Sequence, residues 1–239
     1  MVNSSMPDRK QSFRSAPPLI PPNTKQVRRI NIALLRWGPV RDFPWRNKPL
    51  SPFQILIAES LLARTRAEAV AKVIEKMWQR FPTPSDLASA PVEKVAEIIA
   101  PLGLRKRAEM LRSCAVSVKS NGDVPNDRSA LLGMAGVGGY VADAVRVFAF
   151  NERVIPIDAV IGRVLRRVLG YQSFGPAYAD RALWQVAQLF ATTHDARQVT
   201  AALLDLGALI CLPEHPRCPS CPLRHCCVYG VEQLKAASN

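Results

Sequence analysis

Four cysteines near the C-terminal end have the spacing of a metal centre. They form the pattern C-x6-C-x2-C-x5-C within seventeen residues, at Cys211, Cys218, Cys221 and Cys227. Four thiolates this close together bind zinc or an iron–sulfur cluster, and ligand chemistry alone leaves both open. The other two cysteines lie outside the pattern: we expect Cys114 to be a small core residue and Cys226 to be a neighbour of the ligand set.

Two acidic residues also stand out from their surroundings. Glu59 interrupts the run PFQILIAESLL, which is apolar on nearly all sides of a helix. Its carboxyl therefore either faces solvent at a cleft or is a functional group with a raised pKa, and the sequence leaves both open. Asp158 precedes Ala159, so it is either a plain helix N-cap or a carboxylate directed into a site.

A glycine-rich turn, Gly136-Val137-Gly138-Gly139, separates two apolar helical runs and is followed by Tyr140. Glycine permits positive φ and close approach of the backbone, and the first amides of the next helix can bind an anion such as phosphate. Taken alone this is weak evidence, because any turn between helices can use glycines. A dinucleotide-binding loop is disfavoured, since no strand precedes the turn and the spacing is not G-x-G-x-x-G.

The composition limits the fold and the partners. The chain has 239 residues, 48% of them hydrophobic, which is enough for a sizeable core. A formal net charge of +13 favours a polyanionic partner: DNA, RNA or an anionic membrane face. No run of 18 apolar residues and no signal-type segment is found, so we expect a soluble intracellular protein whose cysteines are thiols or metal ligands.

The segments that position these acids, glycines and cysteines have the apolar periodicity of helices. Residues 1–24 form a basic, proline-rich segment that we expect to be a flexible tail. Helices are predicted over about 25–37, from 52, over 67–81, 85–88 and 91–99, and up to about 119. The last of these follows the turn PLGLRKR, whose three basic residues are either a solvated helix start or a phosphate contact: Arg105, Lys106 and Arg107. No strand-like alternation is long enough to count, so the predicted fold class is all-α.

The cysteine spacing resembles the [4Fe–4S] loop of the endonuclease III and MutY superfamily of helix-hairpin-helix DNA glycosylases, and the resemblance extends from about Trp37 to Cys227. It implies a two-lobed helical fold: a six-helix barrel domain with the helix-hairpin-helix over 47–157, and a terminal domain from 25–46 and 158–239 that carries the cluster. It also implies a [4Fe–4S] cluster on the four cysteines. The expected protein is a monomer in the cytoplasm, nucleoid-associated if prokaryotic, which binds double-stranded DNA and no membrane.

The same resemblance implies roles for particular residues. The segment 132–145 resembles the helix-hairpin-helix, with Ala135 where the family usually has proline and Val141 where it often has threonine. It implies that Gly136, Val137, Gly138 and Gly139 contact DNA, together with Arg64, Leu104 and Arg105. Asp158 occupies the position of the essential aspartate. Glu59 resembles the pocket carboxyl of MutY and of the thymine mismatch glycosylases, an acid that endonuclease III lacks.

Tyr140 distinguishes the subclasses. Endonuclease III has a lysine here that forms a Schiff base, MutY typically has serine, and Mig-type glycosylases acting on T·G and U·G mismatches have tyrosine. Because tyrosine cannot form an imine, the resemblance implies a monofunctional glycosylase without efficient lyase activity. Asp158, Glu59 and Tyr140 are its predicted catalytic residues. Arg64 or Leu104 is expected to fill the stack that the flipped base leaves.

Two alternatives remain open at this point. A MutY-like adenine glycosylase fits Glu59 and Asp158, but we expect the chain to leave no room for the C-terminal domain that recognises 8-oxoguanine in that family. A non-catalytic DNA-binding relative fits the charge and the hairpin, but it has no need of the two acids.

Overall fold

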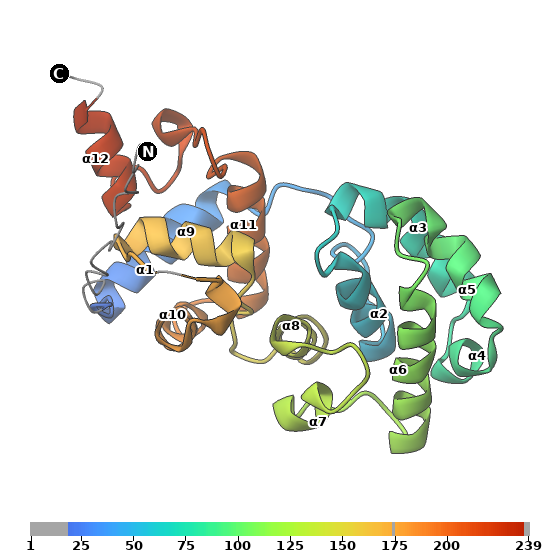
Figure 1. Cartoon of the computed structure of the whole chain (residues 1–239). Coiled ribbons are helices and arrows are strands. Elements are labelled where there is room, and N and C mark those ends of the chain that lie inside the picture. The colour runs from blue at the N-terminus through green and yellow to red at the C-terminus, as the bar shows by residue number, and fades with distance from the viewer. Residues whose placement is uncertain (1–18, 174, 237–239) are drawn as a thin grey trace, which may run out of the picture.

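The computed structural model describes residues 19–173 and 175–236. Within these ranges every regular element is a helix and there is no strand (Figure 1). The predicted all-α fold class is therefore confirmed. No helix in the described ranges is long and apolar enough to cross a membrane. Most of the predicted tail, residues 1–18, lies outside the described part of the chain.

The middle of the chain builds one hydrophobic core. Its helices are α2 (Pro52–Leu62), α3 (Ala67–Arg80), α4 (Pro84–Ser89), α5 (Val92–Ile99), α6 (Arg107–Asn121), α7 (Arg128–Leu132) and α8 (Gly139–Phe150). Leu56, Ile74 and Leu111 are fully buried at its centre. A short 3-10 turn, Ala100–Leu102, leads into α6.

The two ends of the chain share a second core. It is built from α1 (Thr24–Trp37), α9 (Ala159–Leu169), α10 (Arg181–Gln188), α11 (Ala196–Leu209) and α12 (Val228–Ala236), with 3-10 turns at Ala177–Ala179, Leu189–Ala191 and Cys218–Ser220. Leu34 from α1 and Phe190 near α10 are both fully buried there. Val147 of α8 also belongs to this core, so α8 lies between the two groups of helices (Figure 1).

Local signals explain where the helices begin. Asn23 and Gln26 form a capping box at the start of α1, and Ser51 and Gln54 form another before α2, whose first residue is Pro52. Every residue of α2 from Phe53 to Leu61 except Gln54 is buried, because the helix is covered on all sides. The predicted helices over 25–37 and from 52 are confirmed, whereas the domain boundaries near residues 47 and 158 stay predictions.

Candidate active site

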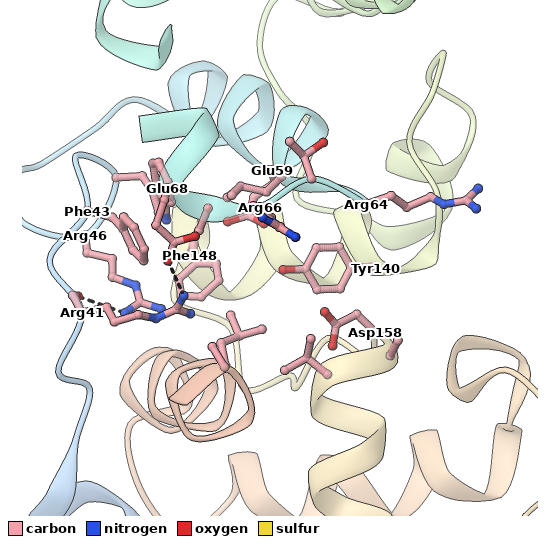
Figure 2. Close-up of a pocket in the computed structure, with 18 of the residues that line it drawn as sticks. Arg41, Phe43, Arg46, Glu59, Arg64, Arg66, Glu68, Tyr140, Phe148 and Asp158 are labelled. Carbon is pink, nitrogen blue, oxygen red and sulfur yellow. Dashed lines mark hydrogen bonds and ion pairs between the residues drawn. The ribbon is translucent and has the colours of Figure 1, made fainter. Parts of the chain in front are cut away.

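A cleft of about 570 Å³ lies between the two groups of helices. Its walls include Arg41, Phe43, Trp45, Arg46, Glu59, Arg64, Arg66, Tyr140, Phe148, Asp158 and Leu204 (Figure 2). The three residues predicted to be catalytic therefore line one cavity. Glu59 lies near the end of α2, Tyr140 at the start of α8 and Asp158 at the start of α9. A cavity of this size holds a molecule as large as a nucleobase.

Glu59 is a buried acid that faces the cleft. The residue is 2% exposed, and its Oε2 atom has no hydrogen-bond partner among the described residues. Burial raises the pKa of its carboxyl to about 7, and the negative charge of Asp158 adds to this. A hydrogen bond from Tyr140 and the positive charge of Arg46 act in the opposite direction. Of the two interpretations that the sequence left open, a solvent-facing acid or a functional carboxyl, burial favours the functional carboxyl.

Asp158 caps a helix and also lines the cleft. Its Oδ1 accepts a hydrogen bond from the amide of Ile161 at 2.7 Å, as an N-cap should. Burial raises the pKa of this carboxyl, while the amides of Ile161 and Val160 and the charge of Arg163 lower it in part. The amides at the start of α9 thus favour the ionised form of Asp158, but desolvation outweighs them. The ionised form is therefore held in a poorly solvated place, where a nearby positive charge is strongly favoured.

Tyr140 is the second residue of α8 and lies beside both acids (Figure 2). Burial and then the negative charges of Glu59 and Asp158 raise the pKa of its phenol well above the usual value. The hydroxyl therefore stays protonated and serves as a hydrogen-bond donor between the carboxylates.

The glycine turn forms a tight hairpin before α8. Gly136 has a φ of +75°, and a Cβ atom there would collide with the Met110 side chain. Val137 is buried and anchors the turn. Gly138 is the N-cap of α8 and has no side chain to bond the first amides of the helix, so these amides are free for an external acceptor.

The other predicted DNA contacts lie near the cleft or beside it. Arg64 lines the cleft with a φ of +62°, rare for a residue other than glycine, and its side chain extends away from Tyr140 (Figure 2). Leu104 packs partly against the first core and Arg105 is exposed, and neither lines the cleft. Arg107 donates a hydrogen bond to the carbonyl of Ser60 at 3.1 Å, so this turn abuts the end of α2.

An ion-pair cluster that the sequence analysis missed fixes one wall of the cleft. Asp205 of α11 is fully buried and accepts hydrogen bonds from Arg41 Nε at 2.6 Å and Arg46 Nη1 at 2.9 Å. Burial alone would raise the pKa of Asp205, but these arginine contacts hold it below its usual value. Both guanidinium groups also lie over the ring of Phe43, which stacks on Trp45 at 4.7 Å. The signal was present, since Asp205 interrupts the apolar run ALLDLGAL just as Glu59 interrupts its own.

The four patterned cysteines surround one small cavity. Cys211, Cys218, Cys221 and Cys227 all line it. Arg167 donates a hydrogen bond to the sulfur of Cys211 at 3.4 Å, and the amide of Gly230 donates one to the sulfur of Cys227 at 3.3 Å. Both contacts suit thiolates. Within the described ranges no three His, Cys, Asp or Glu side chains are arranged to hold a metal ion.

The remaining two cysteines lie apart from this set. Cys226 lines a different cavity, beside α1 and the end of α9. Cys114 is 1% exposed in the first core, where burial raises the pKa of its thiol to about 12. Its predicted role as a small core residue is confirmed.

Helix α9 joins the cysteine loop to the cleft. Arg163 donates hydrogen bonds to the carbonyls of Cys211 at 2.9 Å and Gly207 at 2.8 Å. Arg167, one turn further on, contacts the carbonyl of Leu212 at 2.5 Å. Because Asp158 is the N-cap of this helix, the same element that carries the acid also holds the first cysteine of the loop.

Comparison with known proteins agrees with this arrangement. Over 211 residues the chain is 34% identical to a thymine/uracil-DNA glycosylase of Methanothermobacter thermautotrophicus, a match that covers 87% of this chain and 95% of that one. It is 37% identical over 199 residues to an adenine DNA glycosylase of Mycolicibacterium smegmatis, covering 82% of this chain and 68% of that protein.

The fold is likewise similar to a solved one. The structure of a thermostable thymine-DNA glycosylase matches with a TM-score of 0.80 and 33% identity, covering 87% of this chain and 98% of that one. Residues 57–188 match the model of the HhH-GPD superfamily of base excision DNA repair proteins. This stretch includes Glu59, the hairpin, Tyr140 and Asp158, and it spans more than half of the chain. The protein therefore belongs to the HhH-GPD superfamily of base excision DNA repair proteins.

Proposed function

We propose that this protein is a monofunctional DNA glycosylase that hydrolyses the N-glycosidic bond of thymine or uracil opposite guanine. The observation that carries the proposal is the meeting of Glu59, Tyr140 and Asp158 in one cleft. The similarity to thymine/uracil-DNA glycosylases over most of both chains supports the substrate class.

The cleft suits a base that has left the helix. A target nucleotide must be extruded from the stack, which costs a few kcal/mol and least at a mismatch. In this proposal the uncapped amides at the start of α8 hold backbone phosphate. Arg64, whose side chain extends away from Tyr140, fills the position that the base leaves. The net charge of +13 attracts the duplex irrespective of sequence.

Bond cleavage places a positive charge on the sugar. As the base departs, the carboxylate of Asp158 stabilises this charge electrostatically. Glu59, with a pKa of about 7, is present in both protonation states at neutral pH. It can therefore donate a proton to the departing base or orient the attacking water. Tyr140 stays protonated, supplies no imine-forming amine and donates a hydrogen bond within the pocket.

A [4Fe–4S] cluster is proposed for the cavity lined by Cys211, Cys218, Cys221 and Cys227. When bound, it supplies structural cross-linking of a basic loop rather than chemistry on the glycosidic bond. Arg217 and Arg224 belong to that loop. The hydrogen bonds that Arg167 and Gly230 donate to sulfur would stabilise the thiolates that such a cluster needs.

Adenine opposite 8-oxoguanine is the second candidate substrate. The similarity to the mycobacterial adenine DNA glycosylase favours it, and the two acids of the cleft are compatible with it. The chain spans only about two thirds of that relative.

Labelled duplexes separate these activities. Oligonucleotides containing G·T, G·U or 8-oxoguanine·A are incubated with the protein and analysed with and without alkali. We expect cleavage at T and U after alkali only. Breakage only at adenine would favour the second candidate, breakage without alkali would contradict the monofunctional assignment, and no breakage in any duplex would refute the enzyme.

The control for this assay is Asp158→Asn. Asparagine also caps helices well, so the variant should fold and bind DNA while losing turnover.

A further inference from the structure

We propose that Arg128 is a DNA phosphate ligand beside the hairpin, held in position by the buried Asp143 and by Trp184. The inference rests on the proposed function in that it takes duplex DNA as the partner, and it adds a residue from α7 to the contact surface. The sequence analysis gave Arg128 no role, and only the last residue of α7, Leu132, belongs to the segment that it singled out.

Only one of the three guanidinium nitrogens of Arg128 has a hydrogen bond within the described ranges. It is the first residue of α7, and its Nε donates a hydrogen bond to Asp143 Oδ1 at 2.9 Å. Its guanidinium carbon lies 5.6 Å from the centre of the Trp184 ring. The side chain is nevertheless 38% exposed, and within the described ranges its two terminal nitrogens have no hydrogen bond. A charged group held this firmly with its outer edge open is arranged to bind something from solution.

The free edge lies against the hairpin. A Cβ atom at Gly139 would be 3.2 Å from Nη2 of Arg128, tighter than ordinary contact. Gly139 is the first residue of α8, where the amides have no capping side chain. The guanidinium and these amides therefore border the same space, and a phosphate oxygen bound there would meet donors from both. A side chain at position 139 would push the guanidinium away.

Asp143 fixes the direction of this guanidinium. The residue is 1% exposed on α8 and also accepts hydrogen bonds from Arg146 at 3.1 Å and from Trp184 Nε1 at 3.0 Å. Elements α7, α8 and α10 thus converge on one carboxylate. Because the side chain of Arg128 is already ordered, a phosphate that binds it has little further conformational entropy to overcome.

The same contacts make the proposal testable without unfolding the protein. Removing the charge of Arg128 leaves Asp143 with Arg146 and Trp184 as partners. We therefore expect Arg128→Gln to melt within a few degrees of the parent protein. Arg112→Gln is the matched control, since Arg112 is also a partly exposed arginine that pairs with an acid, Glu109, but it lies on α6 against α4.

The experiment measures the affinity of full-length protein for an undamaged duplex across a series of salt concentrations. The binding constant falls as salt is added, and loss of one phosphate contact makes the slope of log K against log salt less steep by about 0.9. If the two proteins bind equally at 1 M salt, this difference amounts to about an eightfold weaker Kd at 0.1 M salt. We expect this change for Arg128→Gln, none for Arg112→Gln, and a slope restored by Arg128→Lys. The affinity of the lysine variant should stay below that of the parent, since lysine presents no planar fork.

Two results overturn the inference. If Arg128→Gln weakens binding but leaves the salt slope unchanged, the residue only supports the hairpin. If neither quantity changes, it does not contact DNA at all. Failure of the proposed function looks different, because a protein that cleaves no mismatched duplex would still show the slope difference if Arg128 binds phosphate.

Discussion

The substitution Glu59→Gln should stabilise the protein in a strongly pH-dependent way. Glutamine has the size of a protonated glutamate and cannot ionise, so it removes the cost of burying a charge while keeping the shape of the side chain. In the parent protein Glu59 is 2% exposed, and its folded pKa lies at about 7 against an ordinary 4.5. The folded state therefore binds a proton that the unfolded state has lost between these two pH values.

The magnitude follows from the shift in pKa. Each pKa unit corresponds to about 1.4 kcal/mol, so a rise from 4.5 to about 7 makes ionised Glu59 destabilising by about 3 kcal/mol once the pH exceeds 7. The penalty is absent below pH 4.5 and grows as the pH rises, reaching about 1 kcal/mol near pH 5. Because the glutamine variant carries no such penalty, it should exceed the parent by these amounts.

Urea unfolding at pH 5 and pH 8 measures the difference. We expect the advantage of Glu59→Gln in free energy of unfolding to increase by about 2 kcal/mol between the two conditions. Glu97→Gln is the control, since Glu97 is 58% exposed and pairs with Lys94 on the surface, so its effect should be equal at both pH values. An equal effect of Glu59→Gln at both pH values would refute the raised pKa.

The same residue gives the activity a pH dependence whose sign reports its role. If protonated Glu59 delivers a proton to the departing base, single-turnover rates should fall as the pH rises through about 7. If ionised Glu59 orients water, they should rise over the same interval. Rates measured between pH 5.5 and 8.5 distinguish the two roles, and a flat profile would exclude both.

Further expectations concern the other residues of the site. Tyr140→Lys should gain lyase activity, detected as a borohydride-trapped complex with DNA; no trapped complex would contradict the assignment of this position. Cys218→Ser should lose iron and the absorbance near 400 nm, while Cys226→Ser, outside the four-cysteine cavity, should keep both; zinc in place of iron would refute the cluster. Asp205→Asn should lower stability at neutral pH by about 3–5 kcal/mol, since it uncouples two buried arginine contacts. Its effect should shrink only as the pH falls below about 3.8, because the folded pKa of Asp205 lies lower still.

Local periodicity was enough to predict most of the fold. The capping boxes of α1 and α2 and the apolar faces behind them are signals within a few residues of each other, and the helices begin where those signals place them. Glu59 could also be singled out from the sequence, because an acidic side chain in an apolar helix is costly to bury unless it is paired or functional. The convergence of α2, α8 and α9 on one cleft was accessible only through the resemblance to a family.

Partnerships across the chain were not predictable in this way. Asp205 binds Arg41 and Arg46 about 160 positions earlier, and no spacing rule links them. The pairing of Arg128 with Asp143 and Trp184 has the same character, since α10 is brought to the hairpin by the second core and not by local sequence. An acid in an apolar helix indicates that a partner exists; only the structure identifies it.

The ion pairs of Asp205 bear on how firmly the two groups of helices are joined. The loop carrying Arg41 and Arg46 crosses from one group of helices to the other, and its fully buried anchor lies on α11. Swinging the two groups apart would leave a buried carboxylate without its counter-ions, at a cost of several kcal/mol. The ion pairs of Arg41 and Arg46 with Asp205 therefore oppose separation of the two groups of helices. Under the proposed function, the deformation needed for binding then falls to the duplex, which must bend and release a base.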